Sequence, residues 1–169
     1  MGQLLAMFRR SRLDATRIRS VWCDHIKSGD HYFQKVVLGV CSRNACIRSA
    51  MLASTQQFAA NEDEENFVLS NLADRITVFF EQLITDDVIS NQADLQKQCY
   101  ELGRQHCSYS KKMFKISYWE EFLLMMMDVL ENEHPETTKD EQKAWHAFIR
   151  FINENMLDGY LDATSYVKQ

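Results

Sequence analysis

Apolar residues recur at helical spacing through long stretches of the chain, and few residues interrupt the pattern. The clearest stretch runs from Phe67 to Ile84, and its repeating apolar residues are Leu69, Leu72, Ile76, Phe79, Phe80 and Leu83. Residues three and four positions apart lie on one face of an α-helix. The 169 residues include only five glycines and one proline, whereas short strands joined by turns need many such breaks. The sequence therefore predicts an all-α fold and argues against a β-sandwich or barrel.

The same spacing predicts six or seven helices of unequal length. A polar loop over 53–66 ends in four acidic residues, which suit the positive end of a helix that begins at Phe67. Thr138 and Glu141 fit a capping box ahead of the last helix, and Gly159 is placed to end it. The expected helical segments are 13–27, 31–41, 42–51, 67–84, 95–109, 114–130 and 144–156.

Length and composition indicate one domain with its own core. The boundaries that we expect are an N-terminal extension over 1–12, a folded domain over 13–162 and a C-terminal tail over 163–169. A net charge of −5 gives no reason to expect nucleic acid as a partner. No run approaches the roughly 18 apolar residues of a membrane span, and we expect no signal peptide. Five cysteines without a C-x-x-C pair indicate reduced thiols in a cytoplasmic protein.

The first twelve residues allow two interpretations. Gly2 follows the initiator Met, and Arg9, Arg10 and Arg12 form a basic cluster. Acylation of Gly2 together with this cluster would supply the two signals of a stable peripheral membrane anchor. The acylation pattern, however, has Ser or Thr where this chain has Ala6. A solvated tail is the alternative.

The segment from Leu95 to Tyr109 ends its apolar stripe in a histidine. As a helix it places Leu95, Cys99, Leu102 and His106 on one face. An imidazole at the end of a buried stripe can offer a ring nitrogen to whatever fills the space opposite. A core histidine that is bonded to a backbone carbonyl is the alternative interpretation.

The other four histidines show no common metal-ligand spacing. They fall on separate segments, so we expect them at surface or rim positions rather than in one metal site. They are His25, His31, His134 and His146.

Four segments, taken in chain order, resemble the globin family, and its invertebrate, nematode-like branch in particular. Val21-Trp22 looks like the end of a globin first helix, and LGRQH, ending at His106, resembles the Leu-Gly-x-x-His segment whose histidine binds haem iron. YWEEFLL from Tyr118 resembles the start of the penultimate helix, and AWHAFIRFINENMLDGY from Ala144 resembles the last helix. The resemblance covers residues 13 to 162. It implies a globin fold of six to eight helices around a haem pocket.

The resemblance also implies a cofactor and its contacts. The cofactor would be haem b, iron protoporphyrin IX, with His106 as the proximal iron ligand. No histidine falls on the helix expected to face His106. The residues implied to contact the haem are Val37, Met51, Leu72, Arg75, Ile76, Leu102, Met113 and Trp119.

Two departures from the family pattern bear on gas binding. Met51 stands where most globins have a phenylalanine against the haem, for which Phe58 could substitute, and Leu72 stands where oxygen carriers have His or Gln. A hydrogen-bond donor stabilises bound dioxygen by about 1 to 1.5 kcal/mol, or about tenfold in affinity. An apolar distal side therefore predicts weak oxygen binding and ready oxidation of the iron. Arg75 is the candidate donor; its alternatives are a haem propionate partner or a solvated side chain.

These features favour a globin that reversibly binds a diatomic gas, O₂, CO or NO. Oxygen binding or transport is one use, and the apolar pocket tilts the interpretation toward gas or redox sensing. A globin-type redox enzyme, such as a nitric oxide dioxygenase or nitrite reductase, is an alternative, but the chain shows no reductase domain and we expect it not to be an enzyme. A haem-free interaction module on a globin scaffold is the other alternative. The sequence leaves the oligomeric state open.

Overall fold

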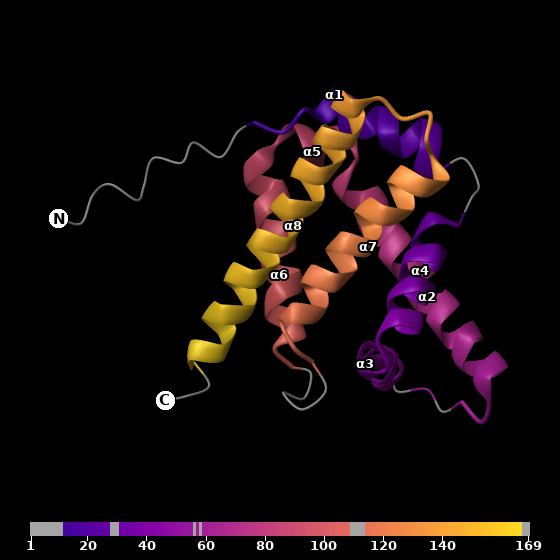
Figure 1. Cartoon of the computed structure of the whole chain (residues 1–169). Helices are drawn as coiled ribbons and strands as arrows, with labels where there is room; N and C mark the ends of the chain where they lie inside the picture. The colour runs from indigo at the N-terminus through magenta and orange to yellow at the C-terminus, as the bar shows by residue number, and fades with distance from the viewer. Residues whose placement is uncertain (1–11, 28–30, 56, 58, 109–113, 167–169) are drawn as a thin grey trace.

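The computed structural model describes residues 12–27, 31–55, 57, 59–108 and 114–166. Within these residues the chain forms eight α-helices and one π-helical turn, and no strand (Figure 1). The elements are α1 (Ala15–Ser20), η1 (Val21–Ile26), α2 (Tyr32–Arg43), α3 (Ala45–Thr55), α4 (Glu62–Leu83), α5 (Asp86–Ser90), α6 (Gln92–His106), α7 (Ser117–Glu133) and α8 (Lys139–Tyr166). The predicted all-α fold is confirmed.

Several predictions concern residues outside the described ranges. These residues are Gly2 with its acylation pattern, most of the basic cluster, Phe58 and Met113. No helix among the described residues is long and apolar enough to cross a membrane.

Helix α4 begins earlier than its apolar pattern predicts. The side chain of Asn61 accepts a hydrogen bond from the backbone N–H of Glu64 at 3.0 Å, and the Glu64 carboxylate accepts one from the N–H of Ala60 at 2.8 Å. The first bond satisfies an N–H group that the first turn would leave unbonded, and the second ties the residue before the N-cap to that turn. The acidic residues expected in the loop therefore belong to the first turn, where the helix dipole favours them.

A buried aromatic cluster ties α2 to α8. The hydroxyl of Tyr32 donates a hydrogen bond to the backbone carbonyl of Met126 and accepts one from the indole N–H of Trp145 at 3.2 Å. Phe33, beside Tyr32, packs against Phe80 of α4 with ring centroids 4.6 Å apart. Because the hydroxyl is fully buried, the pKa of Tyr32 is raised well above its usual value. The polar atoms of this core are thus paired within it.

Helices α6 and α8 cross at very close range; Figure 1 draws α6 in salmon and α8 in orange to yellow. Gly103 of α6 lies against the backbone carbonyl of Met156, and Gly159 of α8 lies against the backbone carbonyl of Tyr100. The prediction that Gly159 ends the last helix is wrong. The glycine lies inside α8, where the missing Cβ makes room for α6. The predicted capping box is confirmed: Thr138 and Glu141 bond reciprocally.

We expect Gly103→Ala to separate α6 from α8 and to lower the free energy of unfolding by about 3 kcal/mol. The added methyl group would overlap the Met156 carbonyl oxygen, a backbone atom that cannot rotate away. Gly39→Ala is the matched control because its new methyl group meets only the flexible thioether of Met125, at 2.8 Å. Chemical unfolding of both variants measures the difference. Equal effects at the two positions would contradict this account of the helix crossing.

Candidate functional site

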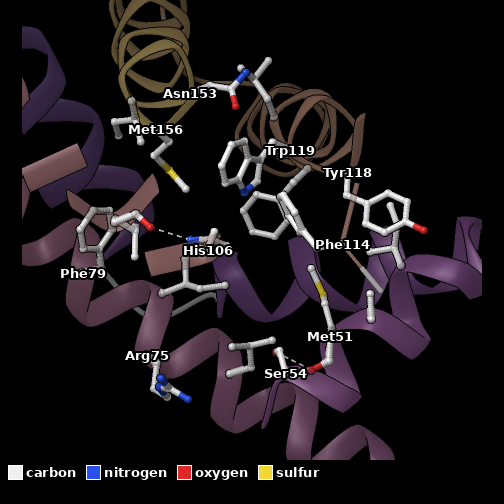
Figure 2. A pocket seen from close by; sticks show the side chains of 18 of the residues that line it. Met51, Ser54, Arg75, Phe79, His106, Phe114, Tyr118, Trp119, Asn153 and Met156 are labelled. Carbon is white, nitrogen blue, oxygen red and sulfur yellow. Dashed lines mark hydrogen bonds between the residues drawn. The ribbon is translucent and has the colours of Figure 1, made fainter. Parts of the chain in front are cut away.

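A cavity of about 570 Å³ lies between α3, α4, α6, α7 and α8 (Figure 2). Its wall is mostly apolar and aromatic, with a few polar groups. The described residues that form it are Ile47, Ala50, Met51, Ala53, Ser54, Leu72, Arg75, Ile76, Phe79, Phe80, Leu102, His106, Ser108, Phe114, Tyr118, Trp119, Phe122, Leu123, Met126, Ile149, Ile152, Asn153 and Met156.

His106, the last residue of α6, is held in one orientation. Its Nδ1 lies 2.8 Å from the backbone carbonyl oxygen of Leu102, one helical turn earlier (Figure 2). A carbonyl can only accept, so Nδ1 carries the proton and Nε2 of the neutral ring carries the lone pair. The ring also packs edge-on against Trp119, with centroids 5.2 Å apart, and against Phe114 at 5.7 Å. The bonded carbonyl and these two rings together fix the plane of the imidazole.

Burial disfavours the charged form of the His106 ring. It lowers the pKa of the imidazole below the usual 6.5, although the bond to Leu102 acts in the opposite direction. A neutral imidazole is the form that can ligate a metal ion. The apolar surroundings therefore favour the chemistry that the sequence assigns to this residue.

Most of the predicted site residues meet at this cavity. Leu72, Arg75 and Ile76 reach it from α4, and Leu102 reaches it from α6. Arg75 is exposed although it lines the cavity, so it lies at the mouth. Met51 from α3 and Trp119 from α7 complete the set that the structure brings together with His106.

Val37 does not line the cavity. It is fully buried in α2, whose inner face packs against α4 and α7. That side of the cavity is formed instead by α3, which the sequence indicated only as a short helical piece. The haem contact assigned to Val37 stays a prediction, which its place in the core does not support.

Several wall residues were not predicted. Ile149, Ile152 and Met156 belong to the apolar stripe of the last helix, so the spacing signal existed, but nothing in it separates a cavity wall from ordinary core. Asn153 lies next to that stripe, but it is polar, so the apolar spacing did not indicate it. Phe114 precedes α7 and packs against Trp119 with centroids 4.9 Å apart; no local pattern marks such a residue.

Met51 is fixed in the wall by its own contacts. Its thioether sulfur lies 3.7 Å from the thiol of Cys41 on α2, and its backbone carbonyl accepts a hydrogen bond from the Ser54 hydroxyl at 2.7 Å. The sulfur contact favours simple packing over a role as a second iron ligand.

The family model for globins matches residues 54–156, which is more than half of the chain. The chain belongs to the globin family. A comparison with curated proteins found no match. The matched segment contains α4, α6, α7 and most of α8, the helices that supply all walls of the cavity except the one formed by α3.

The cavity of this globin fits the family's cofactor. Its volume lies within the range of about 300 to 1,000 Å³ that is usual for ligand and cofactor sites. Apolar and aromatic walls suit a porphyrin ring, an oriented neutral imidazole suits its iron, and a cation at the mouth suits a carboxylate. The residues present could therefore hold a haem, with His106 as the protein ligand.

The prediction that the remaining histidines lie at surface or rim positions is wrong for His134. His134 is buried, and its ring centroid lies 5.8 Å from that of His25. Neither residue belongs to the cavity wall.

Acid should destabilise the haem-free protein, and His106 should account for part of the loss. Because the pKa of this residue is lowered in the fold, the unfolded chain binds a proton there more readily. The stability contributed by the neutral ring is complete above the unfolded-state pKa of 6.5 and is lost as the pH falls toward the lower folded-state pKa. Chemical unfolding at about pH 7.5 and about pH 5.5 measures the change. The His106→Gln variant should lose less stability between them than the unmodified chain; an equal loss would show that His106 is not responsible.

Proposed function

We propose that this globin binds haem b and, through it, a diatomic gas reversibly. When bound, the haem supplies an iron that takes up O₂, CO or NO. The observation that carries the proposal is His106, whose ring lines a large apolar cavity with Nδ1 already committed to the Leu102 carbonyl. Nε2 is then the nitrogen that has an electron pair to donate.

The rest of the cavity supports this assignment. Trp119 and Phe114 both pack against the imidazole, so its orientation does not have to be fixed when the cofactor enters. The apolar and aromatic walls suit the faces of a porphyrin ring. Arg75 at the mouth is placed to pair with a haem propionate, and we prefer this role to contact with the gas because the side chain is exposed.

We further propose gas or redox sensing rather than bulk oxygen storage. Of the residues that α4 contributes to the cavity wall, only Arg75 can donate a hydrogen bond; the others are Leu72, Ile76, Phe79 and Phe80. Without an inward donor, dioxygen gains little over carbon monoxide. A protein with this pocket would respond to a gas or to the redox state better than it would store oxygen.

A binding role fits this cavity better than catalysis. Among the described wall residues the titratable ones are Arg75, His106 and Tyr118, and none is a carboxylate. With His106 assigned to the iron, no general acid or base of ordinary pKa remains there to deliver protons. We therefore propose that this globin is not an enzyme.

Two finer assignments rest on the sequence. The resemblance of the Leu102–His106 and Ala144–Tyr160 segments supports membership of the invertebrate, nematode-like branch. All five cysteines, each in the described part of the chain, are free thiols, which supports a reducing, cytoplasmic location. Peripheral membrane contact through Gly2 remains a prediction for the N-terminal extension.

Purified protein mixed with haem should develop a strong Soret band, and His106→Ala should lose it or bind haem far more weakly. The substitution removes the proposed iron ligand and leaves a space the size of an imidazole, so added free imidazole should restore the spectrum. His146→Ala is the control, because this histidine is also partly buried but lies outside the cavity wall. If the unmodified chain binds no haem, the proposal is wrong and the haem-free interaction module replaces it.

Leu72→Gln should raise the oxygen affinity of the haem-loaded protein about tenfold, because it adds one hydrogen-bond donor to an apolar wall. Carbon monoxide affinity should change much less. Leu72→Met is the matched control, since it keeps the volume and adds no donor. Ligand association and dissociation rates give both affinities. An unchanged oxygen affinity in Leu72→Gln would show that α4 does not face the gas.

A further inference from the structure

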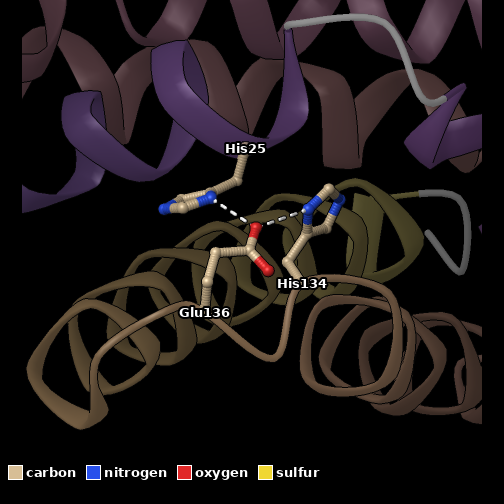
Figure 3. A group of neighbouring side chains, drawn as sticks. All are labelled: His25, His134 and Glu136. Atoms are coloured by element: carbon tan, nitrogen blue, oxygen red, sulfur yellow. Dashed lines mark hydrogen bonds and ion pairs between the residues drawn. The ribbon is translucent and has the colours of Figure 1, made fainter.

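Two histidines and a glutamate from separate elements converge on one point outside the cavity (Figure 3). His25 lies on η1, His134 caps the end of α7, and Glu136 follows in the turn that leads to α8. One carboxylate oxygen of Glu136 lies 3.0 Å from Nδ1 of His25 and 3.3 Å from Nδ1 of His134. All three ligand atoms lie within 4.8 Å of one another.

This donor set has the composition and spacing of a transition-metal site. Two imidazole nitrogens and one carboxylate oxygen are a known ligand set for Zn²⁺, with metal–ligand distances of about 2.0 to 2.2 Å. In tetrahedral geometry such ligand atoms lie about 3.4 Å apart, close to the two distances from the Glu136 oxygen. The two imidazole nitrogens lie within 4.8 Å of each other and would have to approach to reach that spacing.

The surroundings of the cluster favour a cation. The side chains of His25 and His134 are only 13% and 7% exposed, so their rings are held in place, whereas that of Glu136 is 57% exposed. A backbone N–H, and then the two imidazoles, lower the pKa of the Glu136 carboxyl, which is therefore ionised. The carboxylate of Glu141, oriented by the Ser20 hydroxyl, adds negative charge near His25. Two largely covered nitrogen donors and an exposed carboxylate would leave a fourth position on the metal for water.

The local backbone of η1 is unusual at this place. His25 belongs to a π-helical turn, a rare conformation that is found frequently at functional sites. The wider turn changes the direction in which side chains leave the helix, relative to the α-helical register of α1. Here it accompanies the placement of His25 against the α7–α8 turn, a segment more than a hundred residues away in the chain.

We propose that His25, His134 and Glu136 bind one divalent metal ion of the zinc class, which fastens η1 to the α7–α8 turn. The site is independent of the haem cavity, because none of the three residues belongs to the cavity wall. The preferred ions are Zn²⁺ and its neighbours Ni²⁺ and Cu²⁺, which accept imidazole ligands. Mg²⁺ and Ca²⁺ prefer six or more oxygen ligands and should not compete.

Calorimetric titration of the full chain with Zn²⁺, after removal of bound metals by a chelator, tests the proposal. Haem-loaded protein is used, so that His106 is not available to zinc. The haem-free His106→Gln variant is titrated as well, because it removes the same histidine without using haem. Zinc binding can then be tested even if the proposed haem binding is wrong. We expect one equivalent of Zn²⁺ to bind, and His25→Gln or Glu136→Gln to weaken it by at least about tenfold.

His146→Gln is the matched control. His146 is also partly buried, and its Nε2 lies 3.5 Å from a carboxylate oxygen of Glu131, but it lies outside the cluster. This variant should bind Zn²⁺ like the unmodified chain. Zinc should also raise the thermal unfolding midpoint of the unmodified chain and of His146→Gln, but not that of Glu136→Gln. The Glu136 side chain is exposed, so its replacement should not disturb the core. No binding by the unmodified chain, or equal binding by all variants, would overturn the proposal.

Discussion

The close approach of α6 and α8 is the contact on which the site depends. Gly103 and Gly159 face the backbone of the opposite helix at Met156 and Tyr100, and this reciprocal arrangement leaves no space for a Cβ on either side. It fixes α6 one turn before His106, so that the histidine at its end reaches the cavity with its ring against α7. The Leu-Gly-x-x-His segment therefore has a packing reason for its glycine as well as a chemical reason for its histidine.

Helix formation was largely predictable because it depends on local spacing. Apolar residues at three- and four-residue intervals located α2, α4, α7 and α8, and the Thr138–Glu141 capping box was read correctly. The errors arose where local spacing does not determine the structure. Gly159 resembles a helix end in the sequence, but tertiary contact with α6 explains its presence inside α8. The polar segment after α4 includes the short α5, which buries only Ile89 and so shows no period.

The site was predictable only where one helix presents several wall residues. Leu72, Arg75 and Ile76 lie within five residues of one another on α4. When the alignment of this chain with the globin pattern is correct at one of them, it is therefore correct at all three. Val37 was expected at the cavity and does not line it, because α3 lies between α2 and α4 in the chain and forms that wall. No periodic signal in the sequence showed the extent of α3. The pairing of His25 with His134 could not be predicted for a different reason: it joins elements more than a hundred residues apart in the chain, and no sequence spacing connects them.

The size of the cavity bears on the stability of the fold. An empty apolar space of about 570 Å³ leaves the atoms of its wall without packing partners, and this loss grows with the volume. A chain that keeps such a volume must admit water at its mouth or hold an occupant that replaces the missing contacts. A flat apolar group with one strong bond to His106 replaces them over most of the wall. Under the proposed function, holding a haem would therefore contribute to the folding energetics of the protein as well as to its chemistry.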